Sequence, residues 1–279
     1  MLKRFLALLL LCFAGFPLRL GAQGELFAVS RILEKIEARR GSWTAMRAEL
    51  TLHFHTENYQ TATCLGKMAY QRLDEKLILQ CRDARGKLHF AFKAEDRDFQ
   101  LYIPAQNTVF EGSIFDLETT PEFDSYIKPL NLYRALKPMA FRTEQTMLEK
   151  VEKLWLTLRV DTIRREAPFT SRRAYVSPEG DVLKEIYYSF DTTLPTTILR
   201  SEYRLVKTRQ FDLKSRVYYP QHILVQSDAA ERSMQFDFTK IEFFSMLEAM
   251  DWDLAIPAGV QTVSIQTEEG AAMNLQENF

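Results

Sequence analysis

Histidines, paired acids and cysteines are the side chains of this sequence whose type and spacing could support chemistry. His53 and His55 stand two residues apart, and two imidazoles at that spacing on a strand point the same way, as metal ligands would. Both fall on the polar face of an alternating segment, and His89 shares that face from a strand about three strand spacings, or ~14 Å, away. Two ligands without a third make a weak site, so we expect a solvated face and no metal.

Patterns for catalysis are sparse. The sequence has no G-x-S-x-G elbow and no glycine-rich phosphate loop, because its glycines are scattered singly. The acid pairs Asp96/Asp98 and Asp251/Asp253 could serve acid-base catalysis, yet charged residues beside turns are usually solvated. His222 has no cysteine or paired carboxylate near it in the sequence. We therefore expect that the protein is not an enzyme and has no catalytic residue and no cofactor. A hydrolase is kept only as the last of the three functions that we consider.

The elements that would position any site are strands with one apolar face. From residue 43 to residue 112, apolar and polar residues alternate with a period of two, which is typical of half-buried strands. If Leu73 and Asp74 form a two-residue turn, the apolar sets of the flanking strands fall on one side of one sheet. Antiparallel pairing then creates three opposed pairs: Tyr70 with Leu77, Met68 with Leu79, and Gly66 with Cys81.

The rest of the chain predicts one helix before the sheet, a helical stretch inside it and further strands. Apolar residues recur at helical spacing over residues 26–40, and Gly41 ends the run. Residues 113–150 lack alternation and are cut by prolines, which predicts one to three short helices and then a loop. The remaining strands are expected at residues 88–92, 99–103, 108–112, 154–160, 174–176, 183–190, 197–207, 215–219, 223–227, 234–241 and 260–266. The fold class is thus α+β, mainly antiparallel β.

The first 22 residues have the order of a secretory signal peptide: Lys3 and Arg4, an apolar run to residue 16, and small residues ending at Ala22. The run is too short for a bilayer span, which needs roughly 20 apolar residues. Lipidation of Cys12 is disfavoured because Leu11 is the wrong size for that processing. Removal of residues 1–22 changes the net charge from −1 to −4, which argues against nucleic acid. Residues 23–279 can form one large domain or two closely joined ones, and the sequence shows no firm boundary between domains.

Cys64 and Cys81 are the cysteines that would remain after this cleavage. In the predicted register they lie diagonally on the same face of adjacent strands, and an exported protein meets an oxidising compartment. A disulfide and a pair of small buried hydrophobic residues both remain open.

Aromatic residues are numerous, with 20 phenylalanines, 11 tyrosines and 3 tryptophans. Most of them belong to an ordinary core sealed by the predicted helices. A sheet and its helical cover could also enclose a space for a fatty chain. At about 0.8 kcal/mol per buried CH₂, a ~16-carbon chain would gain on the order of 10 kcal/mol before ordering costs.

Three segments carry a resemblance to a known family. Residues 66–77 (GKMAYQRLDEKL), residues 99–107 (FQLYIPAQN) followed by Gly112, and residues 252–263 (WDLAIPAGVQTV) resemble the periplasmic lipoprotein carriers of the LolA type and their LolA-like relatives. The likeness touches most of the chain. Leu73 stands where the family usually has proline, and the chain is longer than a typical single-domain carrier, chiefly through residues 113–220.

The resemblance implies a curved half-barrel sheet that wraps a few helices and presents an apolar cavity. It implies a monomeric periplasmic carrier for lipoprotein acyl chains or another lipid, with an inner-membrane transporter and an outer-membrane acceptor as partners. An envelope sensor or scaffolding module of the same fold, which binds a protein partner, is the alternative. The resemblance implies no catalytic residue, and the candidate cavity lining is Leu50, Leu52, Phe54, Met68, Tyr70, Leu77, Leu79, Phe90, Phe92 and Leu101.

Overall fold

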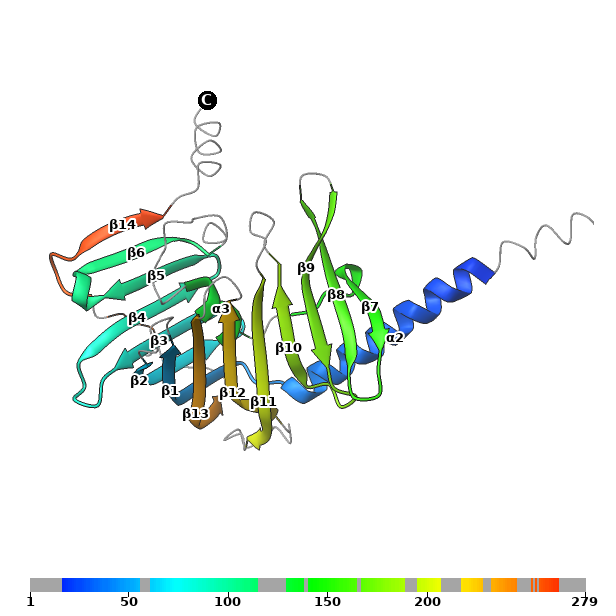
Figure 1. The fold of residues 1–279 in the computed structure, drawn as a ribbon, viewed down its shortest axis with the longest axis horizontal. Coiled ribbons are helices and arrows are strands. Elements are labelled where there is room, and N and C mark those ends of the chain that lie inside the picture. Colours follow the sequence, from blue (N-terminus) through cyan, green and yellow to red (C-terminus); the bar gives the residue numbers. More distant parts are fainter. Residues whose placement is uncertain are drawn as a thin grey trace, which may run out of the picture.

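A single open sheet dominates the chain (Figure 1). The computed structural model describes residues 17–55, 61–114, 129–137, 140–164, 167–188, 195–206, 217–227, 232–244, 252, 254 and 256–265. Within these ranges, fourteen strands follow the order β14-β6-β5-β4-β3-β2-β1-β13-β12-β11-β10-β9-β8-β7. Neighbouring strands are antiparallel except β14 and β6, which are parallel. The predicted α+β, mainly antiparallel class is confirmed.

The elements begin and end as follows: α2 Pro17–Arg40, β1 Ala45–His55, β2 Thr61–Gln71, β3 Lys76–Arg82, β4 Leu88–Glu95, β5 Asp98–Ile103, η1 Pro104–Gln106, β6 Thr108–Ser113, α3 Pro129–Leu136, η3 Thr143–Gln145, β7 Thr146–Val151, β8 Leu156–Arg164, β9 Ala167–Val176, β10 Val182–Tyr187, β11 Thr196–Val206, β12 Val217–Ser227, β13 Arg232–Phe244 and β14 Gln261–Ile265.

The register of β2 and β3 is the one that the apolar pattern predicts. Tyr70 pairs with Leu77 and Met68 with Leu79, so both apolar sets share a face. The two-residue turn is wrong, because the ladder ends at the pair of Gln71 with Lys76 and the loop has four residues, 72–75. The register survives because the longer loop has the same centre as the predicted turn.

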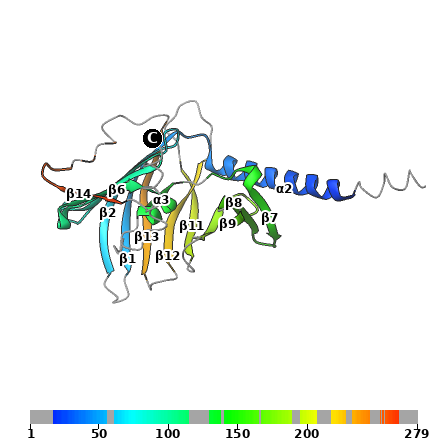
Figure 2. The same ribbon diagram turned by 90° about the horizontal axis from the view of Figure 1, so that it is seen from above.

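Two helices cover the inner, apolar face of the sheet (Figure 2). The short helix α3 lies in the concave side near β12 and belongs to the large core cluster, whose other buried members come mainly from β1 to β5 and β10 to β14. Helix α2 lies at the other end, where Ile32 and Ile36 pack against Leu158, Ala174 and Val176 of β8 and β9. Each half of the inner face therefore has its own cover.

Helix α2 begins at Pro17, nine residues before the predicted start. Its C-terminal part is fastened to the turn between β9 and β10. Lys35 donates a hydrogen bond from Nζ to the Pro178 carbonyl at 2.8 Å, and Arg39 forms an ion pair with Asp181. Gly180 is required at this contact, because a Cβ there would lie 2.7 Å from the Lys35 carbonyl carbon.

The expected cleavage point after Ala22 falls inside α2, and the signal peptide stays a prediction because residues 1–16 lie outside the described ranges. No helix among the described residues combines the length and apolarity that a membrane crossing requires.

Several other sequence-based boundaries are wrong. Strand β8 ends at Arg164 and not at residue 160, and β9 begins at Ala167 and not at residue 174. Residues 146–151, expected in the loop that follows the helices, form the edge strand β7. An edge strand has one neighbour and buries little, and of this strand only Thr146 is buried, so no clear alternation marks it. The separate strands at 215–219 and 223–227 are one strand, β12. Pro220 is tolerated within it because β12 pairs with β13 only from His222 onward, so its missing N–H breaks no hydrogen bond on that side.

The C-terminal segment crosses the outer face of the sheet. Trp252 and Leu254 pack on Ala69 and Ile78, and Ile256 packs beyond them on β4 to β6. The chain then pairs as β14 with β6, where Gly112 lies so close to the Ile265 carbonyl that a Cβ would approach its oxygen to 2.4 Å. The outer face is thus partly apolar and covered by the chain itself.

Candidate functional site

All ten predicted lining residues lie together on the inner face. They come from five consecutive strands, and each side chain is at most 4% exposed. Period-two alternation was sufficient to find them, because in β1 to β5 every second residue faces the same side. They share one contiguous cluster: Leu50, Leu52 and Phe54 in β1, Met68 and Tyr70 in β2, Leu77 and Leu79 in β3, Phe90 and Phe92 in β4, and Leu101 in β5.

Aromatic rings and α3 fill the space in front of these residues. The Trp43 ring lies 4.9 Å from that of Phe243 and 5.8 Å edge-on from that of Tyr70. Leu132 and Leu136 of α3 are fully buried in the same cluster. Burial raises the pKa of the Tyr70 phenol above its ordinary value, so this ring stays neutral and the site carries no charge there.

The ten side chains are closely packed in this conformation, since each is at most 4% exposed. A cavity of about 60 Å³ borders the inner face, whereas pockets for small molecules usually measure about 300–1,000 Å³. Two larger hollows of about 340 and 390 Å³ lie on the outer face, and half of the residues that line each of them are charged. An acyl chain can therefore reach the ten residues only if their cover moves.

Helix α3 is a small cover with few polar attachments. It has eight residues. Lys137, directly after its last residue, bonds to Tyr133 and to Glu75 in the β2–β3 loop. Arg134 stacks over the Tyr187 ring at 4.5 Å, and its carbonyl accepts a hydrogen bond from Arg200 at 3.3 Å. Apolar packing holds most of α3 in place.

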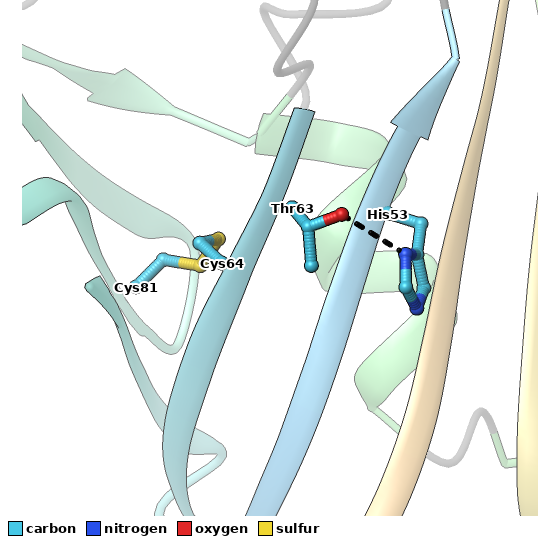
Figure 3. Close-up of a disulfide and its surroundings, with 4 residues drawn as sticks. All are labelled: His53, Thr63, Cys64 and Cys81. Atoms are coloured by element: carbon cyan, nitrogen blue, oxygen red, sulfur yellow. Dashed lines mark hydrogen bonds between the residues drawn. A yellow bond between two sulfur atoms is a disulfide. The ribbon is translucent and has the colours of Figure 1, made fainter. Parts of the chain in front are cut away.

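A disulfide joins Cys64 and Cys81 (Figure 3). Their Cα atoms are 5.7 Å apart, and both side chains are buried in the cluster that holds the ten residues. The bond is diagonal, because Cys81 pairs directly with Gly66. Of the two alternatives that the sequence left open, the structure has the disulfide, and it ties β2 to β3 at the end of the inner face away from the 72–75 loop.

A line of hydrogen bonds crosses the outer face, and sequence reasoning missed it. His53 donates to or accepts from Thr63 at 3.2 Å (Figure 3), and its other ring nitrogen lies 3.1 Å from Asp237. Asp237 also contacts His222 at 2.6 Å, and His222 contacts Glu202 at 3.3 Å. The described residues contain no group of three histidine, cysteine or acidic side chains placed to hold a metal ion. The hydrogen bond to Asp237 raises the pKa of His222.

A second missed feature is a buried ion cluster on the inner face of β9 to β11. Glu185 accepts hydrogen bonds from Arg172 at 3.0 Å and from Arg200, and the Tyr187 hydroxyl donates to it at 3.2 Å. Burial acts to raise the pKa of Glu185, but Arg200 and Arg172 outweigh it, so the pKa is lowered and the carboxylate stays ionised. The cluster separates the apolar region under α3 from the one under α2.

Comparisons with known proteins identify the type of fold. No protein-family model and no curated protein matches the sequence. A putative outer membrane lipoprotein-sorting protein domain from Vibrio parahaemolyticus is similar in structure with a TM-score of 0.58 at 16% identity, over 83% of this chain and 97% of that one. A LolA superfamily protein from Nitrosomonas europaea gives 0.56 at 13% identity, over 81% and 97%.

A DUF1329 family protein from Desulfovibrio piger gives a TM-score of 0.60 at 11% identity, over 83% of this chain and 98% of its own. These likenesses span nearly the whole of the compared structures and most of this chain. Together with the open antiparallel sheet that curves around α3, they show that the chain has the LolA-like fold.

Proposed function

We propose that this protein is a periplasmic carrier that shields the acyl chains of a lipoprotein or lipid from water during transfer toward the outer membrane. The observation that carries the proposal is the continuous apolar inner face of β1 to β5, whose main described helical cover is the eight-residue helix α3. The similarity to a lipoprotein-sorting domain and to a LolA superfamily protein supports the same reading.

The bound chain would lie between the inner face and α3, in contact with the ten residues. Displacing α3 exposes apolar surface, and a fatty chain that takes its place covers that surface again. Each buried CH₂ contributes about 0.8 kcal/mol, so the burial that the fatty chain provides can nearly offset the burial that α3 gives up. The free-energy change of replacing α3 by the fatty chain is then small. Loading and release then need only a small free-energy contribution from a partner protein, which suits a carrier that must release its cargo.

The compartment and partners belong to this proposal. The signal peptide expected at residues 1–22 would export the chain, and the disulfide of Cys64 with Cys81 suits an oxidising compartment. An inner-membrane transporter would supply the cargo and an outer-membrane acceptor would receive it. We propose a monomer that binds no nucleic acid and catalyses no reaction.

Native mass spectrometry of protein purified from a bacterial envelope without detergent tests the function. We expect a lipid adduct, and we expect the delipidated protein to bind a fluorescent 16-carbon fatty acid with a 1:1 stoichiometry. Absence of both the adduct and the binding would overturn the proposal.

Two substitutions in β4 provide a matched pair. Ala94 faces the inner cluster and Ala91 faces the outer one, and both are at most 3% exposed. Replacement of either by leucine overpacks its surroundings at a cost of about 1–3 kcal/mol. Only Ala94→Leu occupies the path of the acyl chain, so it should weaken fatty-acid binding while Ala91→Leu leaves it unchanged. Equal effects would place the ligand elsewhere.

The closed packing favours one alternative, an envelope sensor or scaffolding module that binds a protein partner. In that function the inner face stays packed and the outer surface makes the contact. Affinity capture from periplasm with this protein separates the two. Recovery of lipoproteins or of a membrane transporter supports the carrier, and recovery of a signalling protein by a lipid-free chain supports the sensor.

A further inference from the structure

The sheet is split along part of the boundary between β12 and β13. The two strands pair from Ser227 opposite Arg232 to His222 opposite Asp237, and no ladder pair among the described residues joins 217–221 to 238–244. Each segment stays paired on its other side, β12 with β11 and β13 with β1. We call the boundary between residues 217–221 and residues 238–244 the seam. Its closed end is the pair of His222 with Asp237.

Local sequence explains why the ladder stops at this pair. Pro220 follows in the direction of the seam and has no N–H to donate. On β13, Thr239 is the extra residue of a bulge in the pairing with β1, and its hydroxyl donates to the Glu49 carbonyl at 3.0 Å. A bulge bends its strand, so β13 follows β1 and turns away from β12. A proline and a bulge thus lie just past the last ladder pair.

Aromatic side chains close the seam on its inner side. The Tyr219 ring of β12 packs edge-on against two rings of β13, with centroids 5.4 Å from Phe238 and 6.1 Å from Phe243. Trp43, which lies in the link between α2 and β1, packs on Phe243. All four rings belong to the same cluster as the ten inner-face residues. Movement of these side chains would open a passage to the inner face without breaking a ladder hydrogen bond.

Free space and helix α3 lie at the inner side of the seam. The cavity of about 60 Å³ is lined by Tyr218, Tyr219 and Pro220 of the β12 segment, and also by Trp43 and by Leu136 of α3. Helix α3 contacts β12 as well. The side chains that close the seam therefore have room to move on the inner side. An acyl chain that passed between the two strands would arrive beside the short helix that covers the ten residues.

We propose that the seam between β12 and β13 is the route by which the acyl chain enters and leaves the inner face. The inference rests on the proposed carrier function and adds the path of the ligand. The chain passes between Tyr219 on one side and Phe238 and Phe243 on the other. The seam opens from its closed end, where the side chains of His222 and Asp237 are 2.6 Å apart, and the ladder beyond that pair stays intact.

A chemical link across the seam tests the route. Tyr218→Cys and Lys240→Cys place one thiol on each strand, and a bis-maleimide joins them. Cys64 and Cys81 are held in the disulfide, and Cys12 is replaced by serine in every protein. Stopped-flow fluorescence follows binding and release of a fluorescent 16-carbon fatty acid by the delipidated full chain. We expect the link to slow both rates at least about tenfold and to leave their ratio nearly unchanged, because a gate limits passage and not the bound state.

Two controls isolate the effect of the link. The same double variant capped with N-ethylmaleimide carries both substitutions without joining the strands, so it should keep the native rates. A link between Gln226→Cys and Ser233→Cys joins β12 to β13 at a pair that the ladder already closes, and it should also leave both rates unchanged. Because Tyr218 stacks under Arg39, Gln221→Cys with Lys240→Cys provides a second linkage that spares this contact.

The outcomes separate the route from the carrier function. Native rates in both linked proteins would overturn the seam as the route and leave the carrier function standing. Weaker affinity without slower release would also overturn the route, because the link would then act on the binding site and not on passage. Absence of fatty-acid binding by the native chain would overturn both.

Discussion

Asp237 lies between two histidines on the outer face, and the contacts set how the fold responds to pH. Its hydrogen bond to His222 at 2.6 Å holds the pKa of His222 above the ordinary value. For Asp237, burial acts to raise the pKa, but the bonds from His222 and Gln235 outweigh it, so the pKa is lowered. The pair is therefore charged across the mildly acidic range.

The raised pKa of His222 predicts a stability contribution that declines with rising pH. Protonated His222 stabilises the fold fully below about pH 6.5, the ordinary pKa of histidine, and the contribution is lost as the pH rises through the raised folded-state pKa. Asp237 sets the acidic limit of this contribution. Because its pKa is lowered in the folded state, its stabilising contribution is present above its ordinary pKa of about 4 and is lost as the pH falls through the lowered value. Since His222 is more than a third exposed, the effect should stay below about 1 kcal/mol.

Urea unfolding of the native chain and of His222→Gln at pH 5.5 and pH 9 measures this contribution. The difference in unfolding free energy between the two proteins should shrink at the higher pH. The control is His89→Gln, an exposed histidine on β4. A difference that is the same at both pH values would contradict the prediction.

The disulfide closes a loop of 17 residues between Cys64 and Cys81. A loop of this length predicts that replacing both cysteines by serine lowers the unfolding free energy by about 2–4 kcal/mol, mainly because the unfolded chain gains freedom. Denaturant melts with and without reductant check this. The native chain should lose stability in reductant and the double variant should not change, so a native chain that is insensitive to reductant would contradict the prediction.

At the scale of elements, β14 is an edge strand, and among the described strands it pairs only with β6. The close approach of Gly112 to the Ile265 carbonyl means that Gly112→Ala must push β14 away, because a Cβ would lie 2.4 Å from a backbone oxygen. We expect faster hydrogen exchange at the amides of residues 261–265. Thr262→Ala, an exposed change within β14, is the control. Unchanged exchange in Gly112→Ala would show that β6 and β14 are not so close.

Strands β1 to β5 were predictable because each has one apolar face and pairs with a strand that is close to it in the sequence. The register of β2 and β3 followed from local residues alone, through Met68 opposite Leu79. Strand β7 was missed because an edge strand needs little apolar pattern. The burial of Glu185 on the inner face was missed, because a charged residue between Lys184 and Ile186 is normally assigned to the solvent-exposed face of a strand. The partners of His53 and His222 could not be predicted, since Asp237 meets them only through the pairing of β1, β13 and β12.

At the scale of the whole molecule, a buried ion cluster lies between two apolar regions. Glu185, which Arg172 and Arg200 bind, stands between the apolar cluster under α3 and the one under α2. This arrangement predicts that the halves unfold together.

Glu185→Ala tests that prediction. Removal of the carboxylate leaves Arg172 and Arg200 buried without their shared acid, so the unfolding free energy should fall by about 3–5 kcal/mol. Asp98→Ala, at an exposed acid in β5, should stay within about 0.5 kcal/mol. Circular dichroism and tryptophan fluorescence should give one coincident transition for each protein. Separate transitions would contradict the coupling of the two halves.

Mapping where a bound acyl chain touches β3 tests the central claim most directly. Leu77 and Leu79 face the inner cluster, whereas Ile78 between them faces the outer one. After irradiation of the protein with a 16-carbon fatty acid that carries a photoreactive group near its end, peptide mass spectrometry should find the label on inner-face residues such as Leu77 and Leu79 and not on Ile78. Labelling confined to Ile78 and its outer-face neighbours, or none on a folded protein, would contradict the account.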